Sequence, residues 1–121
     1  MLFKSVYYTT ASGRKPVEEF IFEQDAKARG KIARNLIYLE QHGYLLVRPY
    51  AAKMTDRLYE LRVECGPNNY RILYFFYSGN YIVLVHAFKK KTDKLKRTDI
   101  ETAEQRLKNF EDRIKKGEIK L

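Results

Sequence analysis

The chain has 121 residues, 45% hydrophobic and 32% charged, which fits a single globular domain over 1–121 and excludes a disordered chain. Its apolar runs are too short for a membrane span, and its single cysteine, Cys65, excludes a disulfide framework and a cysteine-cluster metal site. The net charge of +9 indicates a polyanionic partner, namely nucleic acid, an acidic protein or a membrane surface, unless it serves only solubility. Because the N-terminal residues also lack a signal-peptide pattern, we expect a cytoplasmic protein.

The apolar pattern predicts seven elements in the order β-α-α-β-β-β-α. A first strand is expected over 2–8, and two helices over about 16–24 and 25–41, the second ended by Gly43. The segment 42–52 looks irregular. Short connections then make three strands antiparallel, and an apolar 3-4 spacing predicts a last helix; these ranges are 57–64, 69–77, 81–88 and 98–114. The expected fold class is therefore α+β, a mostly antiparallel sheet with two N-terminal helices on one face and a C-terminal helix.

Strand alternation predicts which side chains share a face of the sheet. If Gly79-Asn80 is a two-residue turn, Ser78 pairs with Tyr81. Arg71 then lies opposite Phe88. If the preceding hairpin places Arg62 across from Arg71, Glu60 faces Leu73. One face is almost entirely apolar and should hold the N-terminal helices; its predicted members are Tyr59, Leu61, Val63, Ile72, Tyr74, Phe76, Val83, Val85 and Ala87.

The other predicted face is mixed, and its charged or titratable members are Glu60, Arg62, Arg71, His86 and Lys90. The neighbouring segment 86–97 holds six Lys or Arg residues and one acid. Cations at adjacent strand positions repel unless an anion lies between them. Two interpretations stay open: an ion-pair network of Glu60 with Arg62 or Arg71, or a phosphate cradle of arginine and lysine donors. For His86, a ring satisfied within the sheet–helix contact is an equal alternative to a functional role.

Three strand segments carry a family resemblance: 58–62 (LYELR), 70–75 (YRILYF) and 85–92 (VHAFKKKT). In combination they resemble the RelE/ParE superfamily of toxins, and within it the HigB branch that includes the phage Gp49-like proteins. The resemblance covers nearly the whole chain, so it also implies a RelE-like fold.

This resemblance implies a toxin of a type II toxin–antitoxin system, an endoribonuclease that cuts mRNA in the ribosomal A site and so inhibits translation. Cleavage of this kind needs no metal or other cofactor, because the RNA 2′-hydroxyl attacks the adjacent phosphate while basic side chains stabilise the developing charge. The implied partners are the ribosome, mRNA and a helix-turn-helix antitoxin similar to HigA. Operator DNA would be reached only through the antitoxin, and no membrane is involved.

Residue by residue, the resemblance implies that Arg71 contacts the scissile phosphate, with Arg62 and Lys90 at further basic positions of the site. Either Glu60 or His86 would supply acid–base function, since histidine exchanges protons near neutral pH. The lysines expected to bind RNA are Lys53, Lys89, Lys91, Lys94 and Lys96. The tyrosine that RelE carries past its last strand falls near Lys96 here, so its role is not transferred.

Two other functions remain open on the sequence. A toxin similar to ParE would share this fold and inhibit DNA gyrase without a phosphate-cleaving site. A non-catalytic basic RNA-binding module could use the ten Tyr and seven Phe residues for base stacking, although most of these fall on predicted core positions. An antitoxin could dock on the basic face or on the surface of helices 14–24 and 25–41, of which the second is favoured.

Overall fold

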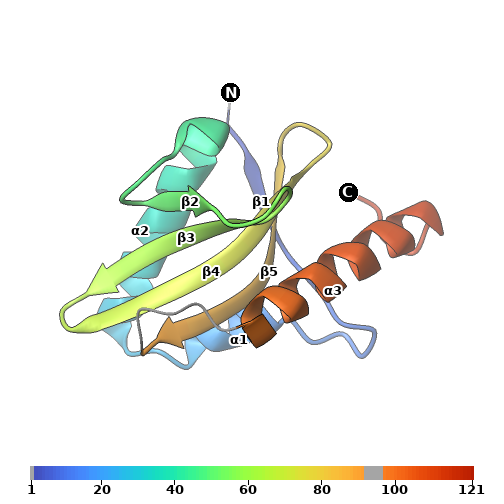
Figure 1. The fold of residues 1–121 in the computed structure, drawn as a ribbon. Helices are drawn as coiled ribbons and strands as arrows, with labels where there is room; N and C mark the ends of the chain where they lie inside the picture. Colours follow the sequence, from blue (N-terminus) through green and yellow to red (C-terminus); the bar gives the residue numbers. More distant parts are fainter. Residues whose placement is uncertain (1, 92–96) are drawn as a thin grey trace.

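The computed structural model describes residues 2–91 and 97–121, which form one five-stranded sheet with helices on both faces (Figure 1). The strand order in the sheet is β1-β5-β4-β3-β2. The strands are β1 (Lys4–Tyr7), β2 (Ala51–Lys53), β3 (Tyr59–Cys65), β4 (Asn68–Tyr77) and β5 (Tyr81–Lys90). The helices are α1 (Pro16–Phe22), α2 (Ala26–His42), the short 3-10 helix η1 (Gly43–Leu45) and α3 (Arg97–Lys115). The predicted α+β class with a mostly antiparallel sheet is confirmed.

Local sequence signals set the ends of the N-terminal helices. Pro16 occupies the first turn of α1, where its missing N–H leaves no helical hydrogen bond unmade. The Asp25 carboxylate caps α2 by accepting a 2.8 Å hydrogen bond from the N–H of Ala28. Gly43 ends α2 at a φ of +52°, and any side chain there would overlap the ring of Phe3. These stops place α2 across one face of the sheet.

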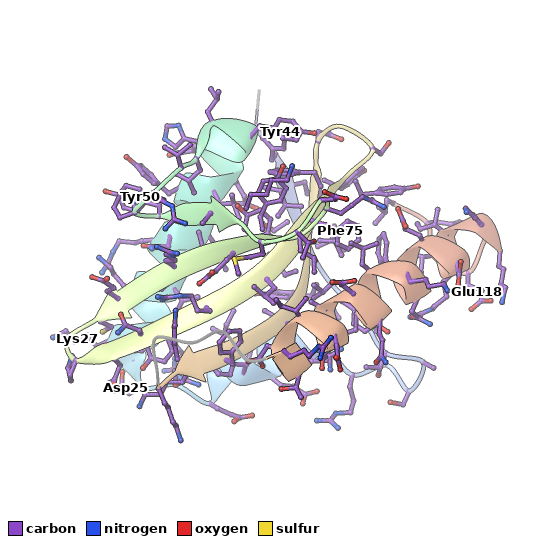
Figure 2. All side chains as sticks on the ribbon, in the orientation of Figure 1. Asp25, Lys27, Tyr44, Tyr50, Phe75 and Glu118 are labelled. Carbon is purple, nitrogen blue, oxygen red and sulfur yellow. The ribbon has the colours of Figure 1, made fainter. Side chains whose placement is uncertain are left out.

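Two hydrophobic clusters form, one on each face of the sheet. The cluster under α1 and α2 contains Val17, Ala28, Ile32, Leu39, Leu61, Val63, Tyr70, Ile72, Tyr74, Ile82 and Leu84. The cluster under α3 contains Tyr8, Leu58, Leu73, Phe75, Val83, Val85, Ala103, Leu107 and Phe110. Phe75 lies between the sheet and α3 (Figure 2), with its ring centroid 5.7 Å from that of Phe110. The second cluster covers one end of the mixed face, so α3 leaves only the other end for charged side chains.

The β4–β5 hairpin differs from the predicted register near its turn. Tyr77, not Ser78, pairs with Tyr81, and a bulge between Leu73 and Tyr74 restores the register, so that Arg71 does lie opposite Phe88. The predicted Ser78–Tyr81 pair is therefore wrong.

The predicted placement of Val83 and Val85 on the face of the N-terminal helices is wrong for the same reason. Ile82 and Leu84 point toward α1 and α2, whereas Val83 and Val85 point toward α3.

The segment 42–52, predicted to be irregular, contains η1 and the edge strand β2. β2 pairs antiparallel with β3, so that Ala52 lies opposite Glu60. Its alanines have little intrinsic preference for a strand, and pairing with β3 forms it. At the other edge, β1 runs parallel to β5, with Lys4 opposite Tyr81. The sheet is thus antiparallel except for this outer pair.

Candidate functional site

Three charged side chains on the mixed face contact one another. The guanidinium Nε of Arg71 contacts the Glu60 carboxylate oxygen Oε1, and Arg62 Nε lies 3.7 Å from the same oxygen. Glu60 is 2% exposed and Arg71 8% exposed, whereas the side chain of Arg62 is 26% exposed. The ion-pair network that the sequence left open is therefore present, and Arg62 is its most exposed member.

Strand pairing explains why these groups meet. β3 and β4 set Arg62 directly opposite Arg71, and alternation along β3 puts Glu60 on the same face as Arg62. Two cations at opposed strand positions repel, so the carboxylate between them offsets that repulsion. A buried carboxylate in turn needs cationic neighbours, because an unpaired buried charge is strongly destabilising.

The arginines keep unused hydrogen-bond donors. Arg71 Nη1 donates a 3.1 Å hydrogen bond to the carbonyl oxygen of Tyr70. The contact with Glu60 pairs the charges without a well-directed hydrogen bond, since Glu60 Oε1, Arg62 Nε and Arg71 Nε have no hydrogen-bond partner within the described ranges. A guanidinium carries five N–H donors, so both arginines retain donors for an oxyanion.

The other predicted lysines do not all gather at this face. Pairing of Asn69 with Lys90 puts Lys90 on the same face as Arg71, at the end of β5. Lys89 lies opposite Tyr70 on the other face, and Lys53 lies opposite Tyr59, also away from Glu60. The grouping of Lys53 and Lys89 with the arginines is thus not supported by the geometry.

Two further lysine positions fall outside the part of the chain that the structure describes. Lys94 and Lys96 lie within 92–96, so their predicted RNA contacts stay predictions. Lys91 follows directly after β5 and is exposed. Lys90 is thus the described lysine that the strand register puts on the mixed face, and Lys91 is an exposed cation next to it in the chain.

His86 shares the mixed face but forms a separate pair with α3. Its Nε2 lies 2.7 Å from Oδ1 of Asp99, and the two side chains are 19% and 15% exposed. The histidine is therefore satisfied in the sheet–helix contact, as one sequence interpretation held. The ring has a second nitrogen, Nδ1, that this contact does not use.

His86 also lines a polar cavity of about 320 Å³ between α1, β5 and α3. Arg106 lines the same cavity and donates a 2.7 Å hydrogen bond to the carbonyl oxygen of Val85. Burial lowers the pKa of the Arg106 guanidinium, and the nearby Tyr8 partly offsets this. Sequence reasoning missed Asp99 as the partner of His86. The available signal was its helical spacing, because Asp99 lies four residues before Ala103, a predicted apolar position of α3.

Metal ligands do not cluster in this structure. Within 2–91 and 97–121, no three His, Cys, Asp or Glu side chains lie close enough together to hold a metal ion. Among the described helices, none is long and apolar enough to cross a bilayer.

The order of helices around the five-stranded sheet roughly matches the RelE-like fold. A family model described as phage-derived protein Gp49-like (DUF891) matches residues 19–108, and the chain belongs to this family. The Gp49-like family is part of the RelE/HigB-like toxin group, so the resemblance of the strand motifs is confirmed at that level. The matched range includes Glu60, Arg62 and Arg71. No curated protein matches the chain.

Proposed function

We propose that this protein is the toxin of a type II toxin–antitoxin system and acts as a ribosome-dependent mRNA endoribonuclease. The observation that carries the proposal is that Arg62 and Arg71 lie opposite each other and both contact the buried carboxylate of Glu60. The chain that holds this cluster is a member of a toxin family. Two guanidinium groups that retain free donors, one buried and one partly exposed, are suited to a phosphate whose negative charge increases during reaction.

In the proposed reaction the RNA 2′-oxygen bonds to phosphorus while the bond from phosphorus to the 5′-oxygen breaks. The products are a 2′,3′-cyclic phosphate and a free 5′-hydroxyl. Arg71 and Arg62 donate hydrogen bonds to the non-bridging oxygens of the pentacoordinate transition state. The ammonium of Lys90 supplies positive charge at the open end of the face and a proton for the departing 5′-oxygen.

His86 is the better candidate for the base that accepts the proton of the 2′-hydroxyl. Both cationic contacts of Glu60 use Oε1, and its 2% exposure leaves it remote from a substrate. His86 lies opposite Leu73, two residues along β4 from Arg71, which is about 7 Å along a strand. Asp99 acts in this proposal as a positioning residue that fixes which ring nitrogen carries the hydrogen.

The test compares mRNA cleavage by the purified protein with and without ribosomes, together with primer extension on a translated message after brief induction. We expect cuts only in ribosome-bound message. Inhibition of gyrase supercoiling without cleavage would instead support a function like that of ParE. RNA binding without cleavage would support a non-catalytic module.

A paired substitution separates loss of chemistry from loss of fold. Glu60→Gln with Arg71→Gln removes the charges of both buried partners and should lower the cleavage rate by about 10²–10³. The matched control neutralises the surface pair of Arg57 and Glu111, whose Nη2 and Oε2 atoms lie 2.8 Å apart. We expect that control to cleave at the wild-type rate, and equal cleavage by both variants would contradict the site assignment.

The proposal includes a cognate helix-turn-helix antitoxin, with operator DNA contacted only through that partner. Because this chain has a net charge of +9, charge complementarity favours an acidic contact surface on the antitoxin. We place this antitoxin on the surface of α1 and α2, where α2 carries Lys31 and Arg34, and binding there would block access to the ribosome. Lys31 lines a small cavity together with Arg62, so the bound antitoxin would also lie close to that arginine.

A further inference from the structure

An exposed apolar surface lies between the end of α2 and the edge strand β2. Leu45 is 81% exposed, Val47 65%, Tyr44 54% and Tyr50 44%. Ile37 and Tyr38 extend this surface along the last turns of α2. Single exposed apolar side chains are ordinary, but a contiguous group of this kind marks an interaction surface.

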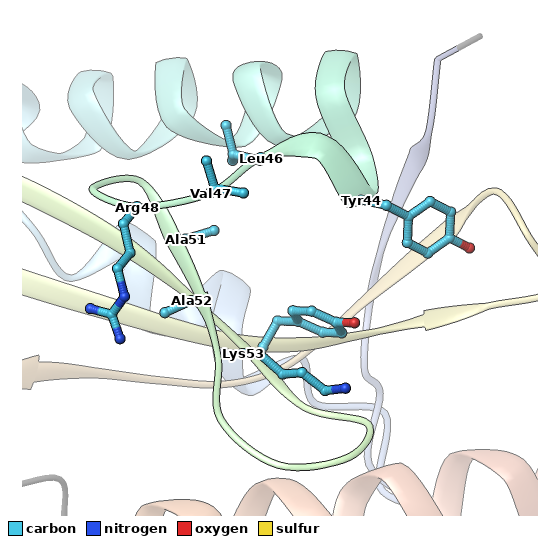
Figure 3. A pocket seen from close by; sticks show the side chains of 8 residues that line it. Tyr44, Leu46, Val47, Arg48, Ala51, Ala52 and Lys53 are labelled. Carbon is cyan, nitrogen blue, oxygen red and sulfur yellow. The ribbon is translucent and has the colours of Figure 1, made fainter.

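This surface contains a groove of about 370 Å³, and Figure 3 shows Tyr44 and Arg48 at opposite ends of it. Its lining residues are Tyr44, Leu46, Val47, Arg48, Ala51, Ala52, Lys53 and Tyr59. The wall at Tyr44 is fixed, because its hydroxyl donates a 3.0 Å hydrogen bond to the carbonyl oxygen of Gly79 and its ring packs 4.1 Å from that of Phe76. The Tyr44 side of the groove is therefore held in place without a partner.

The groove runs along an open strand edge. The carbonyl oxygen of Tyr50 accepts a hydrogen bond from the N–H of Arg62, and the N–H of Met54 donates to the carbonyl oxygen of Leu58. These two bonds show which residues of β2 direct their backbone groups toward β3 and which direct them away from it. Between them, the N–H and C=O of Lys53 point away from β3, as does the C=O of Ala51. Outward backbone groups at an edge can pair with an extended segment of another chain.

The charges around the groove define what can bind. Arg48 and Lys53 are its charged lining residues, and neither forms an ion pair within the described ranges. A second copy of this chain would bring the same two cations together across a two-fold contact, and both copies carry +9. An occupant with carboxylates next to its apolar side chains is complementary instead.

We propose that this groove binds an extended, acidic and apolar segment of a partner protein, added as a strand along β2. Apolar side chains of the segment fill the space beside Val47 and Tyr59, and its carboxylates face Arg48 and Lys53. The groove lies across β2 from β3, and binding there is measured without any RNA. The inference therefore goes beyond the proposed nuclease and can fail independently of it.

The test uses a capped, fluorescein-labelled hexapeptide of alternating leucine and glutamate, titrated with the full chain and followed by fluorescence anisotropy. We expect saturable binding, and amide NMR shifts concentrated in 44–53. Val47→Asp and Arg48→Glu should each weaken binding by about tenfold or more. Two matched controls lie outside the groove and should bind as the wild type does: Leu2→Asp, at a side chain 70% exposed, and Lys27→Glu, in the first turn of α2 (Figure 2).

Several results would overturn this assignment. They are the absence of saturable binding, equal binding of a leucine–lysine peptide, or equal weakening by the control substitutions. Concentration-dependent dimerisation that Val47→Asp abolishes, measured by sedimentation, would identify a second copy as the occupant instead. Thermal unfolding of each variant verifies that the exposed substitutions leave the fold intact.

Discussion

Arg62 and Arg71 lie directly opposite each other on β3 and β4, with the carboxylate of Glu60 against both guanidinium groups. The arginines would repel without that carboxylate, and removing either cation would leave a buried charge with fewer partners. The same three side chains therefore govern the stability of the sheet and, under the proposed function, the position of the phosphate donors.

Arg71→Ala should destabilise the protein by about 3–5 kcal/mol, because it leaves the buried Glu60 with only the more distant Arg62. Replacing both partners, as Glu60→Met with Arg71→Met, should restore most of the free energy of unfolding, since no buried charge is then left without its main partner. Urea denaturation measures the free energy of unfolding of the single and of the double variant. Arg57→Ala, at a partly exposed pair, should cost less than about 1 kcal/mol. If Arg71→Ala cost no more than Arg57→Ala, the ion pair would not be a stabilising element.

Neutralising Lys90 and Lys91 together should weaken binding of a single-stranded oligoribonucleotide and flatten its salt dependence. Each lysine–phosphate interaction contributes about 0.7 to the slope of log K against log salt, so removing two of them predicts a change of about 1.4. Filter binding at several salt concentrations measures this slope. The matched control replaces the exposed pair Lys115 and Lys116 at the far end of α3, and should leave the slope unchanged. An equal change of the slope in both variants would mean that the slope depends only on the net charge of the protein and not on where Lys90 and Lys91 lie.

Asp99→Asn should lower the cleavage rate by about 10² or more if His86 acts as the base. The amide can donate to the imidazole, which favours the wrong tautomer while keeping the shape of the 2.7 Å contact. The readout is the pH profile of single-turnover cleavage, which a purely structural contact would not change. Glu101→Gln, at an exposed pair with Arg97 in the same helix, is the control. An unaltered rate and profile for Asp99→Asn would exclude the histidine as base.

Alkaline pH should destabilise the protein through Tyr74. Burial raises the pKa of its phenol above the ordinary value of 10.0, with Tyr59 adding to the effect. Below pH 10 both folded and unfolded states hold the proton, so stability does not depend on this group. Above it the unfolded chain loses the proton more easily, and the free energy of unfolding falls by up to about 1.4 kcal/mol per pH unit.

Tyr74→Phe should make that decline shallower. Urea denaturation between pH 8 and 11 measures it, and the difference between wild type and variant should be constant up to pH 10. Burial also raises the pKa of Tyr7 and of Tyr70, so part of the decline should remain in the variant. A slope above pH 10 identical to that of the wild type would contradict the burial effect at Tyr74.

The sequence was sufficient for the fold class and, with the register of the β3–β4 hairpin assumed, for the face that Glu60, Arg62 and Arg71 share, because alternation along a strand fixes the face of each side chain. It was insufficient near the turn, where an additional loop residue and the bulge at Leu73 and Tyr74 compensate each other. No local signal distinguishes that arrangement from a two-residue turn with a regular ladder. The predicted pairing of Arg71 with Phe88 was therefore correct, although the turn from which it was counted was not.

Features that depend on contacts between distant segments could not be predicted. β2 exists because Ala51 and Ala52 pair with β3, and alanine alone gives no strand signal. The pairing of His86 with Asp99 depends on where α3 begins over the sheet, which brings Asp99 within reach of the ring. The groove beside β2 likewise arises from the path of 43–50, for which the sequence showed no regular pattern.

The parallel pairing of β1 with β5 has a consequence for how the chain folds during synthesis. Lys4 cannot find its partner Tyr81 until nearly all the strands have been made, so this contact is among the most non-local in the protein. Helices α1 and α2 leave the ribosome before the sheet that they cover exists. A nascent chain that has reached only β3 carries Arg62 without the strand opposite it. Under the proposed function, the phosphate-binding face can assemble beside a translating ribosome only after β4 has emerged. The sheet is complete only after β5 has emerged and paired with β1.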